Sequence, residues 1–454
     1  MSEKRGKLMA GFLIPSIIGV LIFMIPIKYD GSWTIAVKIL ADWIMSAISP
    51  ALPLLCVIII TISAIGSLIG LSKPKWLTEH AILGDTFCTT PVWAIIRCLG
   101  AIFVWLTYLG IGAEDESGLL YMITCGDDGG FILADLLTTL VIIFAIAGFL
   151  LPLLLDFGLL EFIGACLTKV MRPLFKIPGR AAVDCITSWI GDGTLGVMLT
   201  CNQYEGGYYS AREASIVATT FSAVSITFSI VVLGQVGLME YFGVYYLLIC
   251  LVGIACAVIC PRLWPLCRKK DTYLVEGHAM PETLPEGYTS SAQYGVSLAL
   301  KRVSEHKGVG QFLTNGSKNS VGMWFGVLPV VMAIGTIALI LANFTPIFDW
   351  LGVPFKPLLE VLQVPDAAEA SKTMIVGFTD MFTPSILIAG ADVADMTKFI
   401  VAVISVTQVL YLSEVGGLIL GSKLPINLVE LFVIFLERTL ISLIIVCPVA
   451  HLIF

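Results

Sequence analysis

Two polar turns, each containing an aspartate, interrupt apolar sequence at 181–203 and at 370–391. Their polar residues are Gly191, Asp192, Gly193 and Thr194 in the first turn, and Thr379, Asp380 and Thr383 in the second. The apolar arms on either side are too short to cross a bilayer, which takes ~20 residues. The pattern therefore predicts two re-entrant hairpins with polar tips. Non-helical backbone is tolerated at such depth only inside protein or beside a water-filled cavity.

The tips could bind solute through free N–H groups at the start of a half-helix, where the helix dipole is positive. The two aspartates could bind a coupling cation. Aspartate is also a good helix cap, so a purely structural role for Asp192 and Asp380 is an alternative. Both roles are compatible with the sequence.

The apolar segments that follow the hairpins are polar near their middles, with Ser222 in the first and Gln408 and Glu414 in the second. Buried hydroxyls often bond only their own helix, but amides and carboxylates at this depth are costly and mark functional positions. We therefore add Ser222 and Gln408 to the predicted solute site. The predicted ion-coupling residues are Asp192, Asp380, Glu414 and Glu437. A structural pair of Glu414 or Glu437 with Arg438 is the alternative.

The composition requires a membrane environment. Of the 454 residues, 57% are hydrophobic and only 13% charged, about half the charge of a soluble domain. We interpret the first apolar run as a retained transmembrane helix rather than a signal peptide. Nine spans are predicted, at 8–27, 51–71, 92–112, 133–155, 208–236, 243–262, 321–343, 396–420 and 428–452. The amphipathic segment 34–48 is expected to lie at the interface.

Charges alternate between the loops that join these spans. Basic residues gather at 4–7, 73–75, 169–180, 262–318 and 423. Acidic residues gather at 114–128, 349–369 and 392–395. Because cytoplasmic loops carry the excess of Lys and Arg, the pattern predicts a multi-pass protein of the bacterial inner membrane, with its N-terminus in the cytoplasm and its C-terminus outside.

The two hairpin regions match each other at an offset of roughly 185–188 residues, which aligns Asp192 with Asp380. Each unit contains three crossings, an odd number, so the second unit must be inverted. We predict an all-α polytopic membrane protein with two inverted repeats, a pattern typical of secondary transporters. The predicted parts are an N-terminal membrane segment at 1–129, repeat 1 at 130–262, a cytoplasmic linker at 263–320 and repeat 2 at 321–454.

Cofactor chemistry has little support in the sequence. The twelve cysteines include no CxxC pair and the four histidines are scattered, so we expect no metal site and no cofactor apart from a coupling Na⁺ or H⁺. An aspartyl protease would need a dyad that shares one proton. The repeat model instead places Asp192 and Asp380 on tips that enter from opposite faces. We therefore expect a protein that is not an enzyme.

The tip sequence IGDGTLG and the later run FTDMFTPSILIAGADV resemble the YjiH-like branch of the Gate, or nucleoside-recognition, domain membrane proteins. Gate repeats are similar to those of concentrative nucleoside transporters and of bacterial ferrous-iron permeases, although the GxxxxGK[ST] motif of an attached GTPase is absent here. The resemblance implies alternating access, with a nucleoside, base, amino acid or short peptide as solute. A non-transporting membrane scaffold is the alternative. The expected partners are the solute, the bilayer and a second copy in a homo-oligomer, with no nucleic acid.

Overall fold

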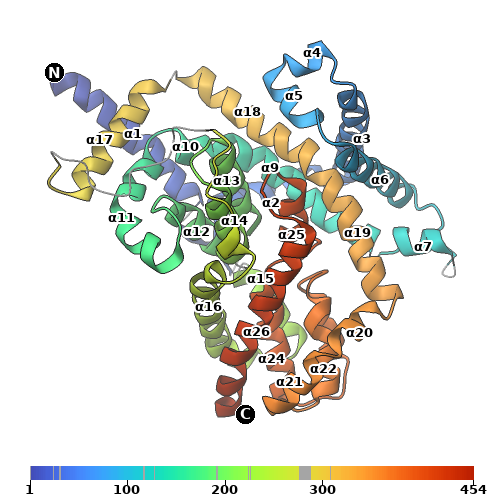
Figure 1. The fold of residues 1–454 in the computed structure, drawn as a ribbon. Coiled ribbons are helices and arrows are strands. Elements are labelled where there is room, and N and C mark those ends of the chain that lie inside the picture. The colour runs from blue at the N-terminus through green and yellow to red at the C-terminus, as the bar shows by residue number, and fades with distance from the viewer. Residues whose placement is uncertain are drawn as a thin grey trace.

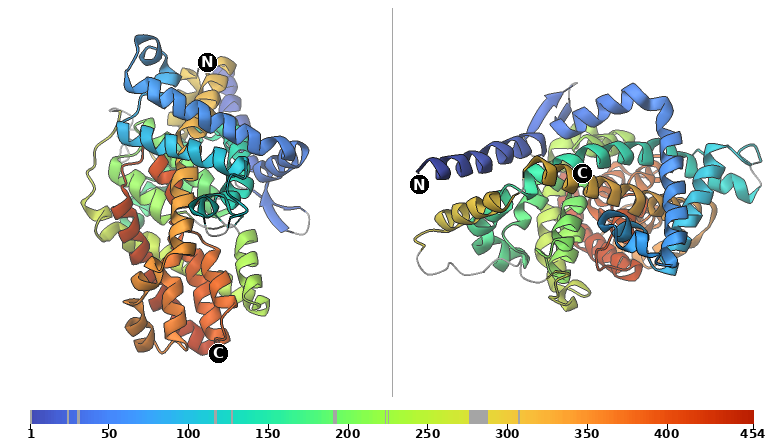
Figure 2. Two further views of the ribbon diagram at one scale, coloured as in Figure 1. Left: turned by 90° about the vertical axis from the view of Figure 1, so that its right-hand side faces the viewer. Right: turned by 90° about the horizontal axis from the view of Figure 1, so that it is seen from above.

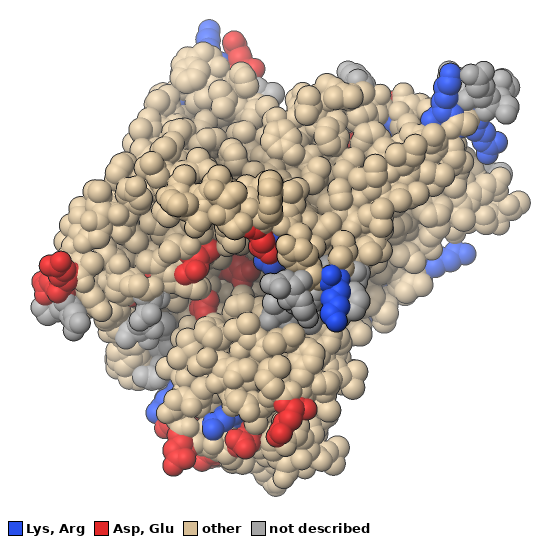
Figure 3. All heavy atoms as spheres, turned by 180° about the vertical axis from the view of Figure 1, so that it is seen from behind, with Lys and Arg blue, Asp and Glu red and all other residues tan. Residues whose placement is uncertain are grey.

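The computed structural model describes residues 2–23, 25–29, 32–115, 118–126, 128–190, 193–222, 224, 226–275, 288–306 and 308–454. This part of the chain is almost entirely helical, with one small antiparallel hairpin of β1 (Pro26–Tyr29) and β2 (Ser32–Ile35). Large apolar side chains lie exposed on the outer helices, among them Ile65, Ile102, Leu247 and Ile444. Figure 3 shows a face that is mostly uncharged, with acidic side chains gathered around a central hollow and further charges at its ends. These features confirm the predicted all-α polytopic membrane protein.

Seven helical runs of the described residues are long and apolar enough to cross a bilayer. They are Arg5–Phe23, Ala36–Leu71, Pro91–Leu109, Leu120–Leu155, Met239–Arg262, Val309–Leu341 and Leu428–Ile453. Each corresponds to one of the nine predicted spans. The segment predicted at the interface, 34–48, is continuous with the second run. The remaining two predicted spans, 208–236 and 396–420, are each divided into two shorter helices.

The N-terminal part of the chain packs against the second half. It contains α1 (Ser2–Phe23), α2 (Ala36–Ile48), α3 (Leu52–Leu71), α4 (Lys75–Thr78), α5 (Ala81–Phe87), α6 (Pro91–Tyr108), α7 (Leu119–Thr124) and α8 (Gly129–Phe131). α3 and α6 pack on each other, and α6 also packs along α19 (Leu328–Phe344). The approach of α6 to α19 depends on Gly100, because a Cβ there would lie 2.2 Å from the carbonyl oxygen of Pro329.

The first half continues from a π-helical turn at Ile132–Leu137 into α9 (Thr138–Leu150) and α10 (Pro152–Leu155). The amphipathic α11 (Leu159–Phe175) precedes the hairpin of α12 (Ala181–Ile190) and α13 (Gly193–Glu205). A divided helix follows, α14 (Ala211–Thr220) and α15 (Ile226–Gln235), and then α16 (Phe242–Ile259). Ser210 and Glu213 form a capping box that fixes the start of α14.

After α17 (Ser291–Glu305) and α18 (Val309–Gly326), the second half passes through the same order of elements. These are α19, then α20 (Ile347–Gly352) and α21 (Phe355–Val361), a hairpin of α22 (Ala367–Val376) and α23 (Thr383–Ala389), a divided helix of α24 (Asp395–Gln408) and α25 (Val415–Gly421), and α26 (Leu428–Ile453). α24 and α16 both pack on α26.

The molecule is elongated, and its termini lie toward opposite ends (Figures 1 and 2). α1 packs against α17 near the N-terminal end. α21, α22, α24 and α26 form the C-terminal end (Figure 1). α18 and α19 run diagonally between the two ends, and α25 lies beside α13 in the middle (Figure 1). In the middle of the molecule each hairpin meets the divided helix of the other half, α13 with α25 and α23 with α15.

Candidate functional site

The second divided helix is interrupted at 409–414, between α24 and α25. Val409 has a φ of +63°, a left-handed conformation that is unfavourable for a β-branched residue. The unwound backbone pairs with the end of α22: the Leu412 N–H donates to Phe378 O at 2.8 Å, and the Ser413 N–H to Thr379 O at 3.0 Å. The interruption is thus held by contacts from the neighbouring hairpin, in a conformation that its own residues do not favour.

Asp380 lies at the tip of the second hairpin and is 7% exposed. Its Oδ1 accepts from the backbone N–H groups of Phe382 and Thr383, at 2.7 and 3.1 Å, and from the Thr383 hydroxyl at 3.3 Å. Its Oδ2 accepts from the Ser413 hydroxyl at 3.2 Å. The carboxylate therefore caps the turn before α23 and also ties the hairpin tip to the unwound segment.

Gln408 is fully buried at the end of α24. Its amide nitrogen donates to Met374 O at 2.7 Å and to the Thr439 hydroxyl at 2.9 Å, which joins α24 to the hairpin and to α26. Gly377 permits this arrangement, because a Cβ at that position would lie 1.9 Å from Gln408 Oε1. Oε1 itself has no hydrogen-bond partner among the described residues.

Arg438, on α26, is 1% exposed and joins the two divided helices. Its Nε and Nη2 donate to Thr407 O at 3.0 and 2.8 Å. Its Nη1 lies 3.2 Å from the carbonyl oxygens of both Thr219 and Thr220. One guanidinium therefore contacts the C-terminal carbonyls of α24 in the second half and of α14 in the first.

A helix that ends inside a protein leaves its last carbonyls without intrahelical partners. At α14 the Phe221 N–H bonds Val217 O, the Ser222 hydroxyl bonds Ala218 O, and Arg438 bonds the last two carbonyls. At α24 the Tyr411 hydroxyl lies 2.7 and 3.0 Å from the carbonyl oxygens of Ser405 and Val406. The C-terminal negative ends of both half-helices are therefore stabilised by a buried cation.

The predicted site residues lie in several environments. Gly193 and Thr194 are buried at the start of α13, whereas Gly191 and Asp192 lie outside the described residues. The Thr379 hydroxyl bonds Val376 O, so like Ser222 it satisfies its own helix end. Glu414 stands immediately before α25. Glu437 is half-buried on α26, and its Oε2 has no hydrogen-bond partner among the described residues.

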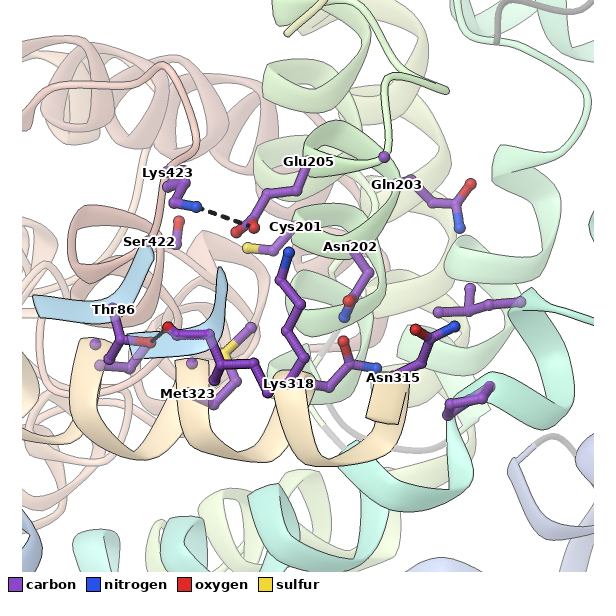
Figure 4. Close-up of a pocket in the computed structure, with 18 of the residues that line it drawn as sticks. Thr86, Cys201, Asn202, Gln203, Glu205, Asn315, Lys318, Met323, Ser422 and Lys423 are labelled. Atoms are coloured by element: carbon purple, nitrogen blue, oxygen red, sulfur yellow. Dashed lines mark hydrogen bonds and ion pairs between the residues drawn. The ribbon is translucent and has the colours of Figure 1, made fainter. Parts of the chain in front are cut away.

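A cavity of about 290 Å³ lies between the halves. Its walls come from α5, α6, α10, α13, α17, α18 and the end of α25. The polar lining residues are Thr86, Arg97, Asp156, Asn202, Gln203, Glu205, Arg302, Asn315, Lys318, Asn319, Ser422 and Lys423. Figure 4 shows Lys318 rising from α18 toward Cys201 on α13, with Asn202 and Asn315 nearby. None of the predicted site residues is among the residues that line this cavity.

Charges around the cavity are arranged in pairs. Lys423 Nζ lies 3.2 Å from Glu205 Oε2 and links the end of α25 to the end of α13 (Figure 4). Asp156 accepts from Arg302 at 3.2 Å and from the Asn315 amide at 2.7 Å. Arg97 donates to the Ser67 hydroxyl and to Thr86 O, both at 2.9 Å. The pairs leave a wall rich in amides and hydroxyls, which suits a small polar molecule.

The sequence did not reveal this cavity because its residues come from segments far apart in the chain. Two signals are available in the sequence: Asn202 and Gln203 are polar residues in the second arm of the first hairpin, and Arg97 is a charge inside a predicted span. The described residues contain no group of three or more histidine, cysteine, aspartate or glutamate side chains placed to hold a metal ion.

Comparisons with known proteins found one matching family model and one similar protein sequence. A family model described as Gate, nucleoside recognition, matches residues 137–239, which span α9 to the segment just before α16. An uncharacterized protein of Alkalihalophilus pseudofirmus is 42% identical over 445 residues, covering 98% of this chain and 94% of that protein. No solved structure matches the chain.

Proposed function

Because the chain belongs to the Gate-domain family of membrane proteins, we propose that it is a secondary transporter of a small polar organic solute. The observation that carries the proposal is the meeting of two interrupted helices on Arg438, one from each half of the chain. Transporters with repeated halves place their sites at interrupted helices near the interface of the repeats. Arg438 therefore links two units that alternating access would move relative to each other, and the Lys423–Glu205 ion pair links them at a second place.

The cavity supports the size and polarity of the proposed solute. Its volume of about 290 Å³ lies near the lower limit for small-molecule pockets. Four amide side chains line it, those of Asn202, Gln203, Asn315 and Asn319. Amides can both donate and accept, as recognition of a nucleobase, a nucleoside or an amino acid requires. These solutes remain the proposed classes, with Na⁺ or H⁺ as the coupling ion.

The distribution of charge supports a cavity that is open toward the cytoplasm. Arg302, Lys318 and Lys423 line it, and all three lie in segments that the excess of basic residues assigns to the cytoplasmic side. α1, whose first turns contain Lys4, Arg5 and Lys7, packs against α17 of the linker, while the C-terminus lies toward the other end (Figure 1). These features support the proposed orientation in a bacterial inner membrane and the inverted relation of the halves.

The proposal can be tested by the thermal stability of the purified protein in the presence of nucleosides, nucleobases, amino acids and dipeptides, each with Na⁺ or at low pH. A ligand at 100 times its Kd adds ~2.7 kcal/mol of apparent stability. We expect one solute class to raise the melting temperature. Asn202→Trp, which fills the cavity, should abolish this shift, and Lys301→Trp on the exposed face of α17 should retain it. A well-folded protein that no solute stabilises would favour the scaffold alternative.

A further inference from the structure

A second polar cluster lies beside the cavity, at the base of the first hairpin. Arg180 and Asp184 are each 1% exposed at the start of α12, and Glu161 of α11 is 8% exposed. Tyr209, in the loop after α13, is fully buried beside them. Tyr208 belongs both to this cluster and to the cavity wall, so the cluster is one side chain away from the cavity.

Arg180 is a buried cation whose guanidinium lacks hydrogen bonds within the part of the chain that the structure describes. None of its three guanidinium nitrogens has a hydrogen-bond partner among the described residues. Its nearest anion is Glu161, with Nη2 and Oε1 3.6 Å apart, and its guanidinium carbon stands 3.9 Å from the centre of the Tyr208 ring. A buried arginine without hydrogen bonds carries a large desolvation cost. The guanidinium is therefore available for an additional or alternative partner.

The carboxylate of Asp184 also lacks part of its possible hydrogen bonding within the described part of the chain. Its Oδ2 accepts from the Tyr209 hydroxyl at 2.9 Å and from the Thr200 hydroxyl at 3.4 Å. Its Oδ1 has no hydrogen-bond partner among the described residues. A buried carboxylate with one oxygen unsatisfied is unstable, whereas a proton on that oxygen removes the charge.

The net charge of the cluster favours uptake of one proton. With all groups ionised, Arg180 contributes one positive charge and Glu161 and Asp184 two negative charges. Most other charged residues of the elements packed on α12 are paired: on α14 Glu213 with Arg172 of α11 and Arg212 with Asp271, and on α13 Glu205 with Lys423. Lys169 of α11 is exposed. At the cavity Arg302 is likewise paired with Asp156.

The remaining titratable groups that face Asp184 are the hydroxyl of Tyr209 and the thiols of Cys185 and Cys201, while Tyr208 lies against Arg180. Burial raises the pKa of Tyr208, so this loop side chain stays neutral at physiological pH. A single additional proton would therefore neutralise the cluster.

We propose that Asp184 is the site at which the coupling proton binds, a role that rests on the proposed transport function. The proton enters from the side of the neighbouring cavity and binds Oδ1, and it leaves when the carboxylate pairs with Arg180. Arg180 also disfavours Na⁺, because its buried guanidinium repels a second cation that would have to sit beside the carboxylate, whereas a proton binds covalently to Oδ1 and removes the charge of the carboxylate. Arg180 is a positioning residue in this scheme, and Asp184 is the group that carries the proton.

Proton binding can be tested without any solute. The melting temperatures of purified wild type and Asp184→Asn are measured between pH 5.5 and 8.5 and compared. A free aspartate binds its proton near pH 3.9. If the native cluster binds it at higher pH, the native state holds more protons than the unfolded chain, and stability increases as pH falls. We expect wild type to gain stability relative to Asp184→Asn toward pH 5.5. Glu369→Gln, on the exposed first turn of α22, should follow wild type.

A second variant tests the direction of the effect. Tyr209→Phe removes a hydrogen bond to the carboxylate, so the transition should move to higher pH. Parallel curves for wild type and Asp184→Asn, or a shift to lower pH in Tyr209→Phe, would overturn the proton site.

Proteoliposomes separate this inference from the proposed function. With a solute that stabilises the wild type, a pH gradient should drive accumulation, and Asp184→Asn should exchange the solute without accumulating it. Accumulation in Asp184→Asn driven by a Na⁺ gradient alone would overturn the proton site and leave the transporter intact. If no solute binds, the proposed function fails, while the pH titration still decides whether Asp184 binds a proton.

Discussion

The guanidinium of Arg438 holds the carbonyl oxygen of Thr407 with two hydrogen bonds, 3.0 Å from Nε and 2.8 Å from Nη2. The same side chain reaches the end of α14 through Nη1. A single residue on α26 thus stabilises the interrupted helix of each half. The two interruptions are separated by more than 180 residues in the chain, yet they share one cation.

Arg438→Leu should destabilise the protein strongly. The change leaves three buried carbonyls without donors, and hydrogen bonds to a charged group contribute about 1.5–3 kcal/mol each. We expect a loss of at least about 3 kcal/mol, measured as a lower midpoint of thermal or denaturant unfolding. Arg438→Lys should lose less, because it keeps the charge but not the planar fork.

Arg262→Leu is a matched control for this prediction. Arg262 also donates to helix carbonyls, those of Val258 and Pro173, but its side chain is exposed. Its loss should cost well under half as much as that of Arg438. Equal losses for the two variants would contradict the account of Arg438 as a buried link.

Gly377→Ala should also be destabilising. The new methyl group would meet Gln408 Oε1 at 1.9 Å, and Gln408 cannot move away without losing its bonds to Met374 and Thr439. Overpacking of this kind costs about 1–3 kcal/mol. Gly390→Ala, after the second arm of the same hairpin, meets no atom closer than 3.7 Å and should be nearly neutral in the same unfolding assay.

Substitutions of Asp380 distinguish capping from ion binding. Asp380→Asn keeps an oxygen that can accept from Phe382 and Thr383, so stability should change little. Asp380→Ala removes the cap and should cost about 2 kcal/mol. If transport survives in Asp380→Asn with normal stability, the carboxylate acts only as a cap. If Asp380→Asn is stable but inactive, its charge has a direct role in transport.

The proposed orientation predicts which side of the membrane reaches the cavity. Asn319→Cys places a thiol on the α18 wall, where a membrane-impermeant maleimide should react in inverted vesicles. A cysteine at Leu247, on the outer face of α16, should remain unlabelled because lipid covers it. Mass spectrometry of the peptide containing residue 319 reports the modification. Labelling only in right-side-out vesicles would reverse the proposed topology.

The membrane class and seven of the spans could be predicted because length and apolarity alone specify a bilayer-crossing helix. The breaks in the two divided helices have weaker signals in the sequence. Val409, Leu410 and Leu412 are apolar, so the segment 396–420 reads as one continuous span. The second interruption depends on partners from other elements, Phe378, Thr379 and Arg438, and such contacts have no local signature.

The structure brings some of the predicted site residues together, and their roles in transport stay predictions. The hairpins and their polar tips follow from the short apolar arms, and Asp380 and Gln408 both lie at the junction of a hairpin with an interrupted helix. The proposed roles of Asp184 and Arg180 could not be recognised, because Asp184 falls inside the first hairpin and Arg180 directly before it, while the hairpin tip contains the more conspicuous Asp192. Their importance comes from missing hydrogen bonds, which only the packed structure reveals.

Exchange of labelled solute across proteoliposomes tests the central claim most directly, using a solute that stabilises the purified protein. We predict saturable exchange in the wild type and in Lys301→Trp, and none in Asn202→Trp, whose side chain fills the cavity between the halves. A solute that binds the purified protein but never crosses, or one that crosses equally well in Asn202→Trp, would contradict transport through this cavity.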